Sequence, residues 1–323
     1  MDYILSYCFI KSGRVLRSFN MDLPLMPASN MKIVTAILAM RYIKDFKTFF
    51  KNENGNLVIS GAPSTRMTRE KFLELAGKSG KIKRIVFSDA YIDYNFYNND
   101  WTYGNSEYCF QPKILPYIYN EGCDEPHLGR PLMNPLLEMS YDLGVTYTIS
   151  PVHGESFILY RDNIKSLLGH MLYVSCNLAA EHISKYISYI LTGTQGTWEK
   201  SCRIYSEFLN EKFPGRRFHV SDGSGLSRKN LISTYILASL INRDLADLMP
   251  APGHGTLRNR LLNLHDIKIT AKTGSLDGVS SLSGYIYDHD VSFSIIVNNA
   301  FDVYSERIVD ETLLEILNKI NII

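Results

Sequence analysis

Five strand-like runs lie at the two ends of the chain, and this split constrains the fold more than any other feature. The first two runs are joined by Lys11-Ser12-Gly13, a pattern typical of a β-hairpin. The five runs are residues 2–10, 14–19, 267–273, 280–287 and 291–298. A sheet built from both ends predicts a discontinuous α+β domain with an antiparallel sheet of about five strands, rather than alternating βαβ units.

The middle of the chain differs in composition. Residues 51–154 are rich in Asn, Tyr, Gly and Pro, with short strands predicted at 57–60 and 82–87 and one helix at 69–77. We therefore expect a smaller inserted domain over 51–154, with 1–50 and 155–323 forming the main domain. Further helices are predicted at 29–44, 163–173, 178–191, 197–212, from about 233, and at 306–320.

Composition and charge exclude several classes. The 323 residues include 34 Lys and Arg against 33 Asp and Glu, and no basic stripe is present, so a nucleic-acid partner is not expected. No apolar run approaches the roughly 18–20 residues of a membrane span. Residues 1–10 lack a basic segment and a cleavage site, so we expect a strand there and no signal peptide.

The five cysteines include no CxxC pair, which excludes zinc-ribbon and thioredoxin-type motifs. Cys109 and Cys123 lie fourteen positions apart around a Pro-containing stretch. From the residues alone, two free thiols and a disulfide both remain open. A disulfide would stabilise the fold by about 3 kcal/mol and would indicate an oxidising compartment.

Ser29 and Lys32 are the first candidate catalytic pair. Pro27 and the polar residues before Met31 predict a helix start, so the two side chains share one face. A serine is a poor nucleophile unless a base lies within hydrogen-bond reach. Burial or a second cation lowers the pKa of a lysine towards that role. The pair also fits an ordinary Ser N-cap with a solvated lysine.

Two later motifs could complete such a site. Ser175-Cys176-Asn177 lies between two predicted helices, where simple capping would also explain it. Lys272-Thr273-Gly274 ends a predicted strand, where an amine and a hydroxyl could hold a carboxylate, and the N–H of Ser275 could face an oxyanion. Similar triplets occur at 11–13, 18–20 and 78–80, but only this combination keeps the order SxxK, SxN, KTG. That order is the signature of penicillin-recognising serine enzymes.

Longer segments extend this likeness. The chain resembles the low-molecular-mass D-alanyl-D-alanine carboxypeptidases and endopeptidases of the penicillin-binding protein 4 type, over residues 1–50 and about 160–300. The segments that carry the resemblance are PASNMK at 27–32, NLAAE at 177–181, SDGSGLSR at 221–228, GTLR at 255–258 and AKTGSL at 271–276. The resemblance implies a penicillin-recognising transpeptidase-like fold, with helices on both faces of the sheet.

The same resemblance implies the roles of the acylating residues. Ser29 would attack the carbonyl of the penultimate D-alanine, and Lys32 would take its proton. Ser175 and Lys272 would keep that amine neutral or relay the proton to the leaving amine. Asn177 would bind the substrate amide.

Substrate contacts and partners follow in the same way. Lys272 and Thr273 would hold the terminal carboxylate beside Gly274, and the N–H groups of Ser29 and Ser275 would form the oxyanion hole. No metal or organic cofactor is implied. The expected partners are peptidoglycan peptides ending in D-Ala-D-Ala, with β-lactams as covalent inhibitors, and the oligomeric state is not indicated. The resemblance favours a Cys109–Cys123 bond and a periplasmic or extracytoplasmic location.

The chain departs from the family pattern in three places. Ser29 and Ser175 are 146 positions apart, which predicts that one of two nested inserted domains is lost or reduced. Residues 60–64 (SGAPS) replace a usual Gly-Asp-Pro turn, and Cys176 replaces a common Asp.

Other functions are less consistent with the sequence. A class A β-lactamase would space its Glu and Asn by four, whereas Glu207 and Asn210 are three apart. No GxSxG of an α/β-hydrolase and no HExxH of a zinc hydrolase is present. The alternative that stays open is a non-catalytic peptidoglycan-binding or β-lactam-sensing protein with a retained pocket.

Overall fold

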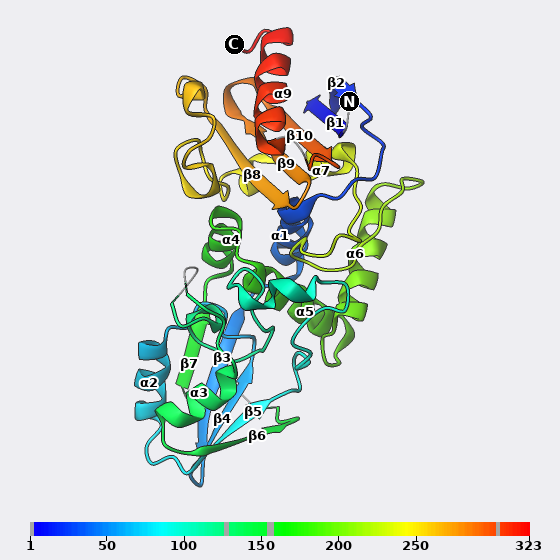
Figure 1. Ribbon diagram of the computed structural model, residues 1–323. Helices are drawn as coiled ribbons and strands as arrows, with labels where there is room; N and C mark the ends of the chain where they lie inside the picture. The colour runs from blue at the N-terminus through cyan, green and yellow to red at the C-terminus, as the bar shows by residue number, and fades with distance from the viewer. Residues whose placement is uncertain (1–2, 126–128, 154–157, 302–303) are drawn as a thin grey trace. The chain divides into compact units, whose positions relative to one another are not determined.

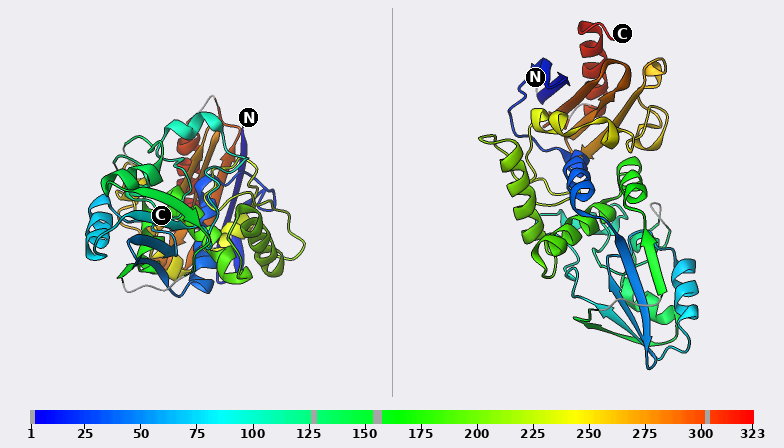
Figure 2. Two further views of the ribbon diagram at one scale, coloured as in Figure 1. Left: turned by 90° about the horizontal axis from the view of Figure 1, so that it is seen from below. Right: turned by 180° about the vertical axis from the view of Figure 1, so that it is seen from behind.

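The computed structural model describes residues 3–125, 129–153, 158–301 and 304–323. The chain divides into two compact units (Figure 1). The first unit comprises Met1–Leu38, Leu168–Cys176 and Cys202–Ile323, and the second comprises Ala39–Leu167 and Asn177–Ser201. Both ends of the chain therefore belong to the first unit (Figure 2).

The first unit contains the sheet that was predicted from the two ends of the chain. Its five strands are antiparallel, in the order β2-β1-β10-β9-β8. Their bounds are β1 Ile4–Lys11, β2 Arg14–Phe19, β8 Ile269–Leu276, β9 Val279–Ile286 and β10 Val291–Asn298. The prediction of about five antiparallel strands is confirmed. Position 2 of the first predicted run lies outside the described residues.

Helices cover both faces of this sheet, as expected. Alternate residues of a strand point to opposite faces. On one face, Phe9 stacks on Phe293 at 5.5 Å between ring centres, and both join the core under α9 (Ser305–Lys319). On the other face, Cys8 and its neighbours pack with α7 (Thr234–Leu240). Figure 1 shows α9 running along the sheet.

The other predicted helices are all present, with bounds close to the predicted ones. They are α1 Met31–Tyr42, α4 Ile164–Tyr173, α5 Asn177–Thr192 and α6 Trp198–Lys212, together with the short α8 Arg243–Ala246, which was not predicted. The expected helix at 29–44 is shorter at both ends, because Ser29 lies in a 3-10 turn, η1 (Ala28–Asn30), that precedes α1.

The second unit has its own five-stranded mixed sheet, in the order β6-β5-β4-β3-β7. The pairs β4–β5 and β5–β6 are parallel, and β3 pairs antiparallel with β4 and β7. The elements are β3 Phe46–Glu53, β4 Asn56–Gly61, α2 Arg69–Lys78, β5 Arg84–Ser88, α3 Pro135–Asp142, β6 Thr146–Ser150 and β7 Ile158–Asp162. Strands β3, β6 and β7 and helix α3 were not predicted; the edge strands β6 and β7 are short and largely exposed.

The expected inserted domain at 51–154 stays a prediction, and we propose wider limits for it. Residue 51 lies within β3, and β7 lies beyond residue 154. Both strands pair in the sheet of the second unit, so the limits that we propose lie outside 51–154 on both sides; residue 154 itself lies outside the described residues.

The second unit also contains the Cys109–Cys123 disulfide, with the two Cα atoms 6.1 Å apart. The bond favoured by the resemblance is therefore present. It closes the segment that carries Phe110, whose carbonyl oxygen accepts a 2.6 Å hydrogen bond from the side chain of Asn177.

Buried polar contacts fasten α5 inside the second unit. The amine of Lys185 is fully buried, donates to Asp93 at 2.6 Å, and lies 3.4 Å from the centre of the Trp198 ring. The indole N–H of Trp198 donates to the buried Glu181 at 2.7 Å. Burial lowers the pKa of His182 to about 3, so this ring is neutral between Thr65 and the carbonyl of Leu115.

We predict that Lys185→Met destabilises the protein by about 3–5 kcal/mol, because it leaves the Asp93 carboxylate buried without its cation. Denaturant titration measures the free energy of unfolding. The matched control is Lys78→Met, which breaks an exposed pair with Glu74 on α2 and should cost less than about 1 kcal/mol. Equal losses for the two variants would contradict this assignment.

Candidate active site

The nucleophile candidate lies in a tight turn at the start of α1. Ser29 is half-buried in the 3-10 turn, next to Ala28, whose φ of 48° lies in the left-handed region. Lys32 follows in the first turn of α1 and is fully buried. Its Nζ lies 3.0 Å from Oγ of Ser29. The predicted pair is thus within the distance needed for direct proton transfer.

A second buried amine lies on β8. Lys272 is fully buried, and its Nζ donates to Oγ of Ser175 at 2.9 Å and to the carbonyl of Thr273 at 2.6 Å. Burial, and to a lesser extent the charge on Lys32, lower the pKa of Lys272 well below its ordinary value. The backbone of Ser175 has a φ of 63°, in the left-handed region.

The KTG motif does not end its strand, contrary to expectation. β8 continues to Leu276 because its residues keep pairing with β9 through Leu276 and Val279. Thr273, Gly274 and Ser275 therefore lie inside the strand, with Thr273 half-buried and Ser275 exposed. Because β8 is the edge strand of the sheet, both its side chains and the backbone edge that faces away from β9 could contact a ligand along this stretch.

Asn177 differs from the other predicted site residues because it belongs to the second unit. It follows Cys176 directly and begins α5, where it is buried. The structure groups Ser29, Lys32, Ser175 and Lys272 in the first unit, while the role expected for Asn177 stays a prediction.

The loop at 221–228 accepts hydrogen bonds from α1. Lys32 donates to the carbonyl of Ser224 at 2.7 Å, and Thr35, one turn later, donates to that of Gly223 at 2.6 Å. Asp222 holds the loop in shape by accepting from the N–H groups of Gly225 and Ser227, both at 2.7 Å. This explains in physical terms why a DGSG sequence accompanies the nucleophile.

Two glycines allow backbone to approach the nucleophile turn. A methyl group at Gly225 would overlap the carbonyl of Ala28 and lie 3.1 Å from the nitrogen of Ser29. A methyl group at Gly274 would lie 2.9 Å from the same nitrogen and 2.7 Å from the carbonyl oxygen of Pro27. The turn is therefore enclosed by the 221–228 loop and β8, and both positions require glycine.

Two of these groups were not assigned a role from the sequence: the Asp222 carboxylate and the Ser224 carbonyl. Asp222 could have been found from the polar, glycine-rich DGSG run, which suggests a loop whose side chain hydrogen-bonds its own backbone. A backbone acceptor such as the Ser224 carbonyl has no sequence signal of its own.

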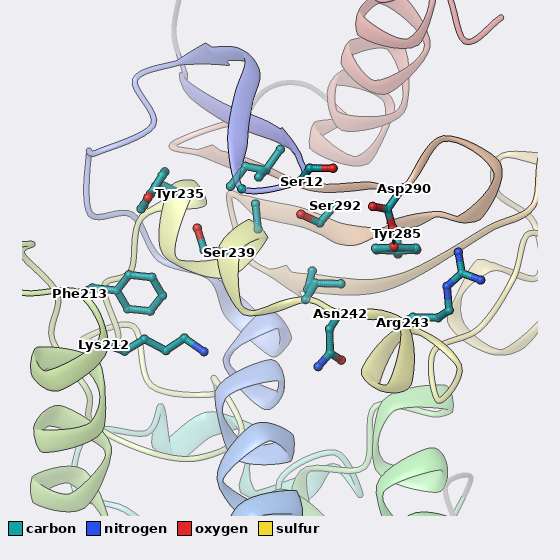
Figure 3. Close-up of a pocket in the computed structure, with 14 residues that line it drawn as sticks. Ser12, Lys212, Phe213, Tyr235, Ser239, Asn242, Arg243, Tyr285, Asp290 and Ser292 are labelled. Atoms are coloured by element: carbon teal, nitrogen blue, oxygen red, sulfur yellow. Dashed lines mark hydrogen bonds between the residues drawn. The ribbon is translucent and has the colours of Figure 1, made fainter.

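A separate groove of about 440 Å³ lies on the first unit and has different chemistry (Figure 3). It is lined by the β1–β2 turn, the end of α6, α7 and parts of β9 and β10. Its Tyr285 hydroxyl donates to Asp290, and three serines, Ser12, Ser239 and Ser292, also line it. None of the residues of the three motifs lines it.

Comparison with known families gives one extended match. The model of the family described as D-Ala-D-Ala carboxypeptidase 3 (S13) matches residues 8–134 and 161–319. Carboxypeptidase DacB of Mycolicibacterium smegmatis is 30% identical over 152 residues, and penicillin-sensitive carboxypeptidase A of Dictyostelium discoideum is 29% identical over 169. These alignments cover 41% and 45% of this chain but only 33% and 32% of the relatives, so they span about a third of each relative's length.

Solved structures share the fold at low sequence identity. Penicillin-binding protein 4 of Haemophilus influenzae superimposes with a TM-score of 0.79 at 18% identity, covering 95% of this chain and 93% of that one. A predatory peptidoglycan endopeptidase of Bdellovibrio bacteriovorus gives 0.62 at 15%, covering 99% and 92%.

We predict that Gly225→Ala lowers the rate of any reaction at Ser29 by about 100-fold or more, because the new methyl group displaces the nucleophile turn. Gly215→Ala is the matched control: its φ of 78° is also left-handed, but nothing lies within 4 Å of the added carbon. It should lose about 1 kcal/mol of stability and keep its reaction rate. Equal rates for both variants would contradict the steric argument.

Proposed function

The chain belongs to the D-Ala-D-Ala carboxypeptidase 3 (S13) family, and on that premise we propose that it is a serine D-alanyl-D-alanine carboxypeptidase and DD-endopeptidase. It would act on peptidoglycan stem peptides through an acyl-enzyme at Ser29. The observation that carries the proposal is the 3.0 Å contact between Oγ of Ser29 and the buried amine of Lys32, with a second buried amine at Lys272.

Acylation begins with proton transfer to Lys32. The neutral amine of Lys32 takes the hydroxyl proton as Oγ of Ser29 attacks the carbonyl carbon of the penultimate D-alanine. The tetrahedral intermediate carries its negative charge on the former carbonyl oxygen, where the N–H groups of Ser29 and Ser275 would stabilise it. Collapse breaks the peptide bond, and the departing amine takes a proton.

Ser175 and Lys272 offer a route for that proton. The amine of Lys272 contacts the Ser175 hydroxyl at 2.9 Å, so a proton can pass between them towards the leaving nitrogen. Lys272 and the Thr273 hydroxyl would also hold the terminal carboxylate of the substrate. Asn177 would bind the substrate amide. Water then hydrolyses the ester and regenerates Ser29.

The groups around Ser29 are amines, hydroxyls and backbone N–H groups. Such a set favours a substrate with a carboxylate and a developing oxyanion. A β-lactam has the same carboxylate and a strained amide, so it would acylate Ser29 in place of the peptide. One structure of penicillin-binding protein 4 from Haemophilus influenzae is a complex with a β-lactam.

We also propose an extracytoplasmic location. The Cys109–Cys123 disulfide supports an oxidising compartment, and the proposed substrate lies outside the cytoplasm. No helix within the described parts of the chain is long and apolar enough to cross a membrane.

We predict that benzylpenicillin forms a one-equivalent covalent adduct on the wild-type protein, visible by intact mass spectrometry, and that Ser29→Ala abolishes it. Ser239→Ala, which removes a serine from the groove of Figure 3, should keep the adduct. A folded wild-type protein without an adduct would contradict the proposal.

Peptide hydrolysis separates the enzyme from its alternative. The wild-type protein should release D-alanine from a peptide ending in D-Ala-D-Ala, and Ser29→Ala should not. An adduct without peptide hydrolysis would favour the β-lactam-sensing or peptidoglycan-binding alternative.

We predict that the acylation rate rises with pH and that the midpoint of this rise lies below the ordinary lysine value of 10.5. Burial lowers the pKa of Lys272, and the charge on Lys32 lowers it further, so the paired amines lose a proton at lower pH than free lysine. Stopped-flow acylation across the pH range measures this. A midpoint near 10.5 would show that the two amines are solvated and independent.

A further inference from the structure

Asn30 lies between Ser29 and Lys32 in the sequence. Its side chain points to the sheet. It is fully buried. In the amide orientation that the surrounding donors and acceptors require, its nitrogen donates to the carbonyl of Lys272 at 2.8 Å. Its oxygen lies 2.7 Å from the hydroxyl of Ser281 and 3.3 Å from the N–H of Leu282. One side chain thus contacts both β8 and β9.

These contacts join the nucleophile turn to the strand that carries the second amine. Gly274 pairs with Ser281 and Thr273 with Leu282, so Asn30 contacts the two strands where the KTG motif lies. The Ser281 hydroxyl is also 2.6 Å from the carbonyl oxygen of Pro27, on the other side of Ser29. The turn is therefore hydrogen-bonded to the sheet both before and after the nucleophile.

We propose that Asn30 is a positioning residue for acylation: its buried amide fixes the nucleophile turn to β8 and β9, and so holds Lys32 and Lys272 at their working separation. The inference rests on the proposed function, because it assumes acylation at Ser29. Asn30 does not touch the reacting atoms. It acts through the backbone of Lys272, whose side chain reaches Ser175.

The separation of the two amines affects the protonation of the base as well as the geometry of the site. Lys32 and Lys272 repel each other when both are protonated, and this favours the neutral amine that acylation needs. The enclosing loop at 221–228 carries two charged side chains: the Asp222 carboxylate is hydrogen-bonded to backbone N–H groups, and the Arg228 guanidinium donates to the carbonyl of Asp277. Without Asn30, β8 can move away from the turn, the repulsion weakens, and the amines keep their protons to higher pH.

The experiment compares the second-order rate of benzylpenicillin acylation, from about pH 5 to pH 10, in four proteins. They are the wild type, Asn30→Ala, Asn30→Leu and Ser281→Ala. We expect Asn30→Ala to lower the rate at pH 7 by about 10- to 100-fold, as for a small misplacement of reacting groups, and to move the midpoint of the pH profile upward.

The other two variants separate positioning from packing. Asn30→Leu keeps a similar side-chain volume but removes the hydrogen bonds, so it should resemble Asn30→Ala in both rate and midpoint. Ser281→Ala removes one hydroxyl and leaves the contact between Asn30 and Lys272, so a smaller shift in the same direction is expected. If the Asn30 variants do not fold, the rate and midpoint of Ser281→Ala still test the inference.

The matched control is Thr234→Val, which removes a buried 2.8 Å contact with Ser6 between α7 and β1. It should lower stability and leave the midpoint unchanged. A wild-type rate and midpoint for Asn30→Leu, or an equal midpoint shift for Thr234→Val, would overturn the inference. If the wild-type protein is not acylated at Ser29, the proposed function fails and the inference fails with it.

Discussion

The burial of two lysine amines is the constraint on which the rest of the first unit depends. An amine removed from water needs hydrogen-bond acceptors, or it becomes neutral. Lys32 has the carbonyl of Ser224 and the hydroxyl of Ser29, and Lys272 has the hydroxyl of Ser175 and a carbonyl of its own strand. The acceptors come from separate parts of the chain, so the nucleophile turn, the 221–228 loop, the Ser175 segment after α4 and strand β8 must all assemble around the amines.

The backbone geometry of the nucleophile turn lets the other segments pack closely around the two amines. Ala28 has a left-handed conformation, and Gly225 and Gly274 bring two other backbone segments against the turn. Strain at Ala28 persists because the surrounding contacts determine the turn. Small residues are therefore needed beside Ser29 for space, while Asp222 and Asn30 supply the polar contacts that hold the enclosing segments in place.

Much of the fold and site could be predicted from the sequence, for identifiable reasons. The strands near the chain ends have strong apolar patterns, and the order of SxxK, SxN and KTG has chemical meaning that single motifs lack. The second sheet was largely missed because a strand such as β6 has short, exposed sequence. The predicted strand ended at residue 273, whereas pairing with β9 carries β8 on to Leu276. Asn30 was overlooked because its role arises from strands some 240 positions away.

The pairing of β1 with β10 has a consequence for when the chain can fold during its synthesis. Ile4 lies opposite Asn298, and the strand that carries Lys272 lies next to β9 in the same sheet. Contacts between such distant segments form late, because a long loop must close first. During synthesis Ser29 emerges long before Lys272, so the serine has neither its enclosing strand nor its second amine. A nascent or truncated chain would therefore be inert, and reactivity would appear only once the last strands have joined the sheet.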